Sequence, residues 1–130
     1  MFTLNSDAVW TGPNPLATLL AAWDPKRMDA LLLLVPRDRA TGHLGAGDFE
    51  LDGDGRLTRG RDTVYAGAQI VKTDALHAIP DRVFSLNRLW DAFARDGRLF
   101  GALHEGGWCD VGRPESIPLA EAMLRAASHV

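Results

Sequence analysis

The stretch "ALLLLVP" (Ala30–Pro36) decides the fold class of this chain. Its apolar residues follow one another without polar alternation, which is typical of a strand that is covered on both faces. The preceding segment "GPNPLATLLAAWDP" (Gly12–Pro25) predicts a helix, with Asn14 as N-cap and Pro15 at the first helical position. Phe2–Asn5 reads as a strand before that helix. A strand–helix–strand unit most often builds a parallel sheet.

The remaining segments extend the same pattern along the chain. Asp52–Gly55 carries the turn signal of a hairpin between two short strands. "TVYAGAQIV" (Thr63–Val71) predicts a further strand, and "FSLNRLWDAFARDG" (Phe84–Gly97) a second clear helix. A strand, a glycine turn, "GGWCDVGRPE" (Gly106–Glu115) and a last helix follow. The residues of that helix expected to face inward are Ile117, Ala120, Met123, Leu124 and Ala127. We therefore expect one α/β domain over residues 1–130, a three-layer α/β/α structure with a mixed, mostly parallel sheet.

Composition excludes several classes of function. The chain has 130 residues with a net charge of −3, and no basic block interleaves with aromatic residues, so a nucleic-acid surface is not expected. Cys109 is the single cysteine, which rules out an internal disulfide and fits a reducing compartment. The first residues lack a signal-peptide pattern, and the longest apolar run is too short to span a membrane. We expect a soluble, cytoplasmic domain with no membrane partner.

Two carboxylates stand at the ends of apolar strands. Asp7 follows "FTLN" and Asp110 follows "GGWC". Ligands of open α/β sheets bind beyond the carboxyl ends of strands, and paired carboxylates suit a hard cation such as Mg²⁺. The residues alone leave an alternative for each, because Asp7 also fits a turn and Asp110 also fits a cap of the last helix. Gly67, inside a strand, indicates close approach by a ligand or another backbone.

Other candidate motifs favour structural roles. "GHLGAGDF" (Gly42–Phe49) does not follow a strand, and "DGDGRL" (Asp52–Leu57) lacks the ligands of a calcium loop. The four histidines have no metal-type spacing, and Cys109 reads as a buried, inert thiol. The tryptophans are expected mainly in the core, although Trp10 and Trp108 flank the two acids and could line a pocket.

The order of these motifs resembles the sugar-1-phosphate nucleotidyltransferases, and most closely the short bacterial branch without a C-terminal β-helix. That branch includes N-acetylmuramate-1-phosphate uridylyltransferases and mannose-1-phosphate guanylyltransferase-like enzymes. The segments "LNSDAVW", "TVYAGAQIV", "FSLNRLW" and "GGWCDVGRPE" follow in family order, and the last resembles W-x-D-[VT]-G-[TR]-P-E. The resemblance implies that Asp7 and Asp110 are catalytic, Mg²⁺-binding residues. It also implies that Gly67 brings its backbone to the sugar, and we expect Asn5 and Trp108 to contribute to substrate binding.

The implied reaction is the Mg²⁺-dependent transfer of a nucleoside monophosphate from UTP or GTP to a sugar-1-phosphate, releasing pyrophosphate. The chain lacks the family's L-A-A-G-x-G-T-R-[ML] loop and its P-K-P motif, so it resembles the C-terminal portion without the nucleotide-binding part. We expect no turnover by this chain alone. Ser6 replaces the usual glycine before Asp7, and no acid-Lys-Pro sugar motif is present, which leaves the sugar open.

There are two other hypotheses, of which the first stays open. The chain could be a non-catalytic truncated homologue that binds sugar phosphate, forms a homo-oligomer, or needs a complementing N-terminal fragment to fold. An unrelated phosphatase-like enzyme with Asp7 as nucleophile is disfavoured, because "SDAVW" lacks a D-x-D motif.

Overall fold

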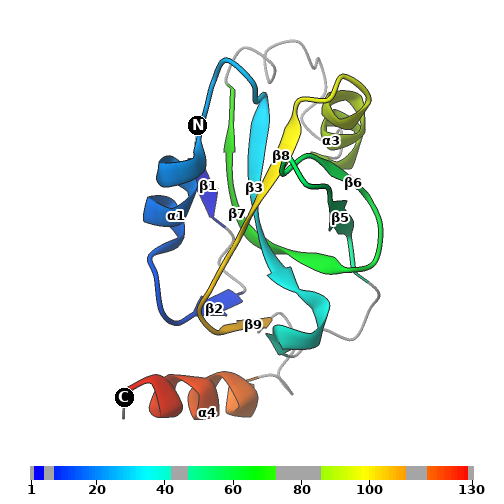
Figure 1. Cartoon of the computed structure of the whole chain (residues 1–130). Helices are drawn as coiled ribbons and strands as arrows, with labels where there is room; N and C mark the ends of the chain where they lie inside the picture. The colour runs from blue at the N-terminus through cyan, green and yellow to red at the C-terminus, as the bar shows by residue number, and fades with distance from the viewer. Residues whose placement is uncertain (1, 5–7, 42–46, 73–85, 111–116, 129–130) are drawn as a thin grey trace.

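Strand β3 (Ala30–Pro36) lies between two other strands in a six-stranded sheet of the computed structural model (Figure 1). The structure describes residues 2–4, 8–41, 47–72, 86–110 and 117–128. The sheet order is β6-β5-β7-β3-β8, and β1 also pairs with β7. The bounds of these strands are β1 Phe2–Leu4, β5 Phe49–Leu51, β6 Leu57–Arg59, β7 Thr63–Val71 and β8 Leu99–Leu103.

Both faces of β3 are covered, as its uniform apolar sequence predicts. Leu31, Leu33 and Val35 pack in one core cluster with Leu19 of helix α1 (Pro15–Ala22). Ala30, Leu32 and Leu34 point to the other face and pack in a second cluster with Leu89, Trp90 and Phe93 of helix α3 (Leu86–Arg95). Because α1 and α3 cover opposite faces of the sheet, the predicted three-layer α/β/α arrangement is confirmed.

The pairing directions correct one detail of the prediction. The sheet is mixed, as expected, but among the described strands β3–β8 is its one parallel pair, and β1–β7, β3–β7, β5–β6 and β5–β7 are antiparallel. The expectation of mostly parallel pairing is therefore wrong for this part of the chain. Because β1 and β3 are both antiparallel to β7, they run in the same direction. They do not pair with each other directly, since β7 lies between them. Antiparallel strands need no helical crossover, and β7 follows the β5–β6 hairpin.

Strand β7 contains a bulge at its small-residue centre. Leu32 pairs with Gln69 and Leu34 pairs with Tyr65, so the three residues Ala66–Ala68 stand opposite Leu33 alone. Gly67 has φ 93°, in the left-handed region that glycine adopts without steric cost. A bulge with two extra residues preserves the alternation of β7 side chains between the two faces, which an insertion of one residue would reverse.

A second, three-stranded sheet lies below the first in Figure 1, in the order β2-β9-β4. It contains β2 (Ala8–Trp10), β9 (Trp108–Asp110) and β4 (Ala40–Thr41), which follows the short 3-10 helix η1 (Arg37–Arg39). Helix α4 (Ile117–Ser128) packs against β9. Of the residues expected to face inward on α4, Ala120 is buried, whereas Ile117 and Leu124 are 49% and 46% exposed. The predicted inward stripe of α4 is therefore wrong at those two positions.

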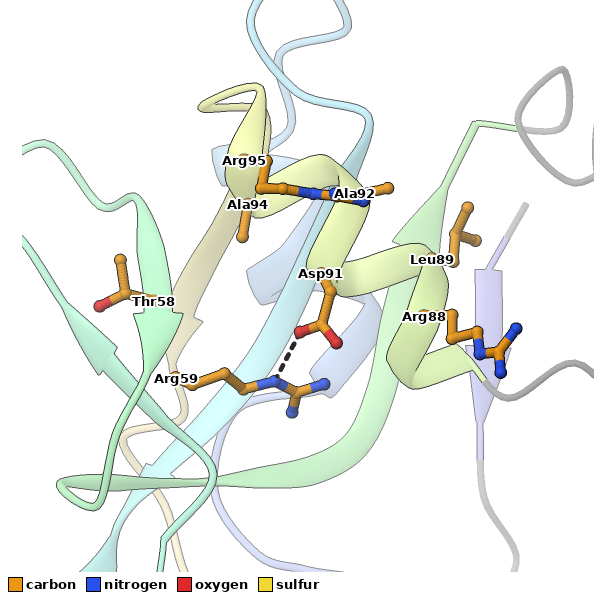
Figure 2. A pocket seen from close by; sticks show the side chains of 8 residues that line it. All are labelled: Thr58, Arg59, Arg88, Leu89, Asp91, Ala92, Ala94 and Arg95. Carbon is orange, nitrogen blue, oxygen red and sulfur yellow. Dashed lines mark hydrogen bonds and ion pairs between the residues drawn. The ribbon is translucent and has the colours of Figure 1, made fainter.

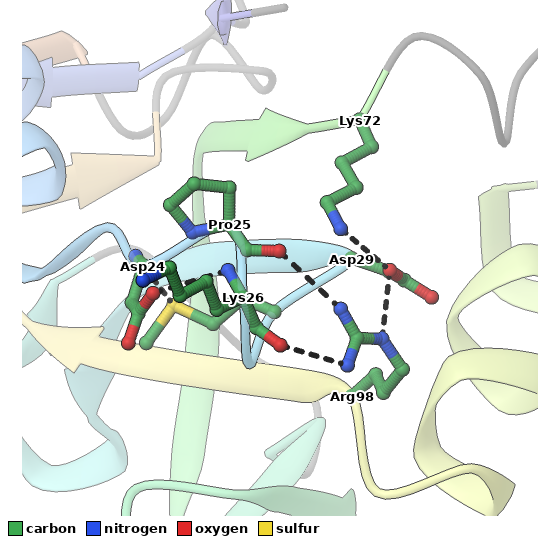
Figure 3. A network of polar contacts seen from close by, with 7 residues as sticks. Asp24, Pro25, Lys26, Asp29, Lys72 and Arg98 are labelled. Atoms are coloured by element: carbon green, nitrogen blue, oxygen red, sulfur yellow. Dashed lines mark hydrogen bonds and ion pairs between the residues drawn. The ribbon is translucent and has the colours of Figure 1, made fainter.

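Local polar contacts hold the ends of these elements. The Asn14 side chain accepts hydrogen bonds from the backbone N–H of Leu16 (2.9 Å) and Ala17 (3.4 Å), which confirms the predicted N-cap. Around the start of β3, Asp29 Oδ1 lies 2.8 Å from Arg98 Nε and 3.5 Å from Lys72 Nζ (Figure 3). Arg98 also donates to the carbonyls of Lys26 and Pro25, which fastens the α1–β3 connection to the start of β8. None of the helices in the described ranges combines the length and hydropathy needed to cross a bilayer.

Candidate functional site

Asp110 is the last residue of β9, and the small sheet places it beside the strand that follows Asp7. Antiparallel pairing aligns Ala8 with Asp110 and Trp10 with Trp108. Ala8 comes directly after Asp7 in the sequence. Asp7 and Asn5 themselves lie outside the described residues. The structure thus pairs the strand that follows Asp7 with the strand that ends at Asp110, although Asp110 lies 102 positions after Ala8 (110 minus 8) in the chain.

The Asp110 side chain shares a face of β9 with Trp108. Residues two apart in a strand project to the same side, and Trp108 belongs to the core cluster on the α1 side of the main sheet. Asp110 is half-buried. The carboxylate therefore stands on the side of the small sheet that faces the main sheet.

Trp108 connects β9 to the bulge of β7. Its indole Nε1 donates a hydrogen bond to the carbonyl oxygen of Ala66, at 2.9 Å in buried surroundings. Ala66 precedes Gly67 in the bulge, so three predicted site residues (Gly67, Trp108 and Asp110) come from strands joined at this point. Trp108 is 4% exposed. The structure thus places Trp108 in the core, with its one polar group engaged by β7.

The turn before β9 is held by a histidine whose role no sequence motif indicated. His104 is 0% exposed, and its Nε2 lies 2.9 Å from the carbonyl oxygen of Thr11 and 3.1 Å from that of Gly107. Because both partners are acceptors, Nε2 carries the hydrogen. Thr11 Oγ1 accepts from the Gly107 N–H at 3.0 Å, and a side chain on Gly106 would clash with the Thr11 carbonyl. His104 is structural, as expected, and it ties the end of β2 to the start of β9.

Cys109 projects to the other face of β9 and is fully buried. Burial is the larger of two causes that raise the pKa of the Cys109 thiol, and the negative charge of Asp110 is the smaller one. The burial that was predicted for Cys109 is therefore confirmed; its inertness stays a prediction, which the raised thiol pKa supports.

The described residues contain one of the two carboxylates that were predicted to bind Mg²⁺, Asp110. No group of three or more His, Cys, Asp or Glu side chains that could hold a metal occurs among the residues with a described position. A closed site of the kind that Zn²⁺ uses is therefore not seen in those ranges. Mg²⁺ is usually held by one or two carboxylates together with substrate phosphates and water. Asp110, with Asp7 as the second expected carboxylate, is compatible with that mode.

A separate groove of about 820 Å³ lies between α3 and β6 (Figure 2). Arg59 Nε and Asp91 Oδ1 are 2.9 Å apart within it, and the Arg59 guanidinium carbon lies 4.8 Å from the centroid of the Phe49 ring. The groove faces away from β9 because α3 covers the other face of the sheet. Gly67, Trp108 and Asp110, the predicted site residues that the structure describes, do not line it; the lining residues are Thr58, Arg59, Arg88, Leu89, Asp91, Ala92, Ala94 and Arg95.

Comparison with known proteins gives one curated relative and a set of similar folds. No protein-family model matches the chain. The chain is 38% identical over 135 aligned residues to an N-acetylmuramate α-1-phosphate uridylyltransferase of Caulobacter vibrioides, covering 98% of this chain and 55% of the relative. The fold of this chain is similar to that of a Bacillus anthracis protein, whose structure is described as a glucose-1-phosphate thymidylyltransferase in complex with sucrose. That match has a TM-score of 0.67 at 14% identity and covers 96% of this chain and 54% of the other.

The chain thus spans about half the length of the proteins that it matches. The expected α/β fold of the nucleotide-sugar transferases is confirmed by the structural match. The sequence match confirms the resemblance on which the site residues were chosen. The chain is therefore homologous, over nearly all of its own length, to one portion of an N-acetylmuramate α-1-phosphate uridylyltransferase.

Proposed function

We propose that residues 1–130 form the C-terminal, sugar-phosphate- and metal-binding portion of a cytoplasmic sugar-1-phosphate nucleotidyltransferase domain. One observation carries the proposal: β2 and β9 pair with Ala8 opposite Asp110, in a chain 38% identical to half of a uridylyltransferase. This pairing supports a shared site for Asp7 and Asp110. The reaction would transfer a nucleoside monophosphate from UTP or GTP to a sugar-1-phosphate, with pyrophosphate as the second product.

In this proposal the two aspartates and Gly67 have distinct tasks. Asp7 and Asp110 would hold Mg²⁺, which neutralises phosphate charge and aligns the reacting groups when it is bound. Gly67, which has no side chain and stands in the β7 bulge, would bring its backbone to the sugar.

A second candidate is a non-catalytic protein that binds sugar phosphate or requires a complementing N-terminal fragment or a second copy. It is favoured by the half-length match and by apolar side chains left in solvent on the α1 side of the fold. Leu4 on β1 is 55% exposed, and Leu16 and Leu20 on α1 are 38% and 58% exposed. Large exposed apolar surface is typical of contact with another polypeptide.

The metal site is testable in the 130-residue chain itself. We expect Mn²⁺, used as a paramagnetic stand-in for Mg²⁺, to broaden the amide NMR signals of β9 and β2 at lower concentrations than those of other strands. Asp110→Asn should weaken this selective broadening at least tenfold. Asp62→Asn, which removes an exposed carboxylate between β6 and β7, is the matched control and should leave it unchanged. Equal broadening in the wild type and in Asp110→Asn would exclude Asp110 as a ligand.

Catalysis is tested by pyrophosphate release from UTP or GTP with sugar-1-phosphates. We expect no turnover by the purified chain. We expect turnover to return, with Mg²⁺, in a full-length protein, and to be lost when the aspartate matching Asp110 becomes asparagine in the Caulobacter relative. Turnover by the 130-residue chain alone would contradict the expected division of the active site. Full Mg²⁺-dependent activity of the aspartate variant would contradict the metal assignment.

A further inference from the structure

We propose that Trp108 is a positioning residue: its indole N–H holds the β7 bulge and sets the spacing between the Gly67 backbone and the Asp110 carboxylate. This inference rests on the proposed function, because it assigns a task to Gly67 and Asp110. Trp108 would act through the backbone of β7 without touching substrate.

The bulge lacks residue-for-residue pairing with strand β3. Ala66 and Gly67 have no residue-for-residue partner on β3, because the register passes from Gln69 opposite Leu32 to Tyr65 opposite Leu34. The backbone there is buried, so a carbonyl without a hydrogen bond would be costly. The Trp108 indole donates to the Ala66 carbonyl at 2.9 Å and satisfies it. The side chain thereby stabilises a backbone shape that deviates from the regular ladder.

The backbone of Trp108 is also held in place. Its backbone lies in the middle strand of the small sheet, opposite Trp10 on β2 and Ala40 on β4. Its ring is 4% exposed in the cluster that includes Ala66 and Ala68, whose small side chains leave room for the indole. Asp110 follows two residues later on the same face of β9. A shift of the ring relative to β7 would therefore move the strand that carries the carboxylate.

Trp90 offers a matched comparison on the opposite face of β7. Its indole Nε1 donates to the side-chain oxygen of Gln69 at 3.0 Å, and Trp90 is 6% exposed. The two tryptophans thus make buried indole hydrogen bonds of similar length to the same strand. Trp90 comes from α3, which carries no predicted site residue, and it bonds a side chain where Trp108 bonds the backbone. Loss of the Trp90 bond should loosen packing without changing the relation between β7 and β9.

The test compares Trp108→Phe with Trp90→Phe in the 130-residue chain. A third variant carries 3-benzothienylalanine at position 108, which keeps the shape of the ring and removes the N–H, so that a result does not depend on how well phenylalanine packs. We measure amide hydrogen exchange at residues 66–69 and the selective Mn²⁺ broadening of β9. Both variants at position 108 should increase exchange at residues 66–68 at least tenfold and weaken the Mn²⁺ effect at least threefold. Trp90→Phe should leave both near wild type.

The same substitutions at the matching positions of the full-length relative give a kinetic readout. We expect loss of the Trp108 N–H to raise KM for N-acetylmuramate-1-phosphate at least fivefold, with a smaller change in kcat. Unchanged exchange at residues 66–68 in the benzothienylalanine variant would overturn the proposal, and so would equal effects of the Trp90 and Trp108 variants. Increased exchange with unaltered Mn²⁺ broadening and unaltered KM would also overturn it, since Trp108 would then be structural alone. If the wild type shows no Mn²⁺ broadening at β9, the proposed metal site fails, and the exchange and KM readouts decide the role of Trp108 separately.

Discussion

Gly67→Ala is the substitution for which the structure predicts the most specific loss of stability. Gly67 is buried in the β7 bulge with φ 93°, a conformation in which a Cβ atom crowds the backbone. Adopting a left-handed conformation costs a residue other than glycine roughly 1–2 kcal/mol. Burial allows little relaxation, so we expect the free energy of unfolding to fall by about 1–3 kcal/mol.

This loss corresponds to a clear change in melting temperature. The unfolding entropy of globular proteins is about 2.1 cal/mol/K per residue, or roughly 0.27 kcal/mol/K for a chain of 130 residues. One kcal/mol then shifts Tm by about 4 °C, and Gly67→Ala should lower it by about 4–11 °C. Urea and thermal unfolding, followed by circular dichroism on the purified chain, measure both quantities.

Two other glycines separate backbone strain from burial. Gly55 has φ 88° in the hairpin turn, where an added Cβ would meet its nearest atom, Phe100 Cδ2, at 3.8 Å. Gly55→Ala should therefore cost the conformational term alone, about 1–2 kcal/mol. Gly53, which has open space and no positive φ, should tolerate alanine within about 0.5 kcal/mol. If Gly67→Ala matches wild type while Gly55→Ala is destabilised, the account of the bulge is refuted.

Three further predictions concern single groups. Tyr65, the one tyrosine in the sequence, has its pKa raised to about 12 by burial, against a weaker opposing effect of a hydrogen bond with Thr3. Its phenolate absorbance at 295 nm should therefore appear near pH 12 in the folded chain. Because the tyrosine of the unfolded chain ionises first, near pH ~10, the free energy of unfolding should fall as the pH rises between those two values. A rise in absorbance near pH 10 in a sample that is still folded would contradict this. Cys109 should react with Ellman's reagent at least a hundredfold more slowly in the native chain than in urea, because its thiol is buried and the pKa of the thiol is raised. Similar rates in the two states would show that β9 opens readily. Asp29→Ala should lower the free energy of unfolding by about 1–2 kcal/mol, because it leaves Arg98 and Lys72 without the carboxylate that they contact. If Asp29→Ala lowers it by no more than the control Asp62→Ala, this partly exposed network does not stabilise the fold.

Features that depend on neighbours in the sequence were predictable. The Asn14 cap, the turn at Asp52 and the burial of Ala30 to Val35 in β3 follow from local backbone chemistry or from an uninterrupted apolar run, and the structure confirms all three. The prediction was wrong where periodicity had to stand in for a partner. Ile117 and Leu124 are at positions of α4 expected to face inward, yet both are exposed, while Ala120 of the same set is buried. A stripe shows which face is apolar and does not show how much of that face another element covers.

The sequence by itself determined the three-layer α/β class and the choice of Asp110, Gly67 and Trp108 as site residues, because apolar runs, glycines and the motif resemblance are written in the order of residues. The tertiary structure decided what these residues do to one another. It paired Ala8 with Asp110, created the β7 bulge, and joined the two through the Trp108–Ala66 hydrogen bond. It also made most strand pairs antiparallel. Pairing direction, register and a hydrogen bond from an indole to a distant carbonyl are long-range contacts whose energies depend on the packed fold, and no local pattern specifies them.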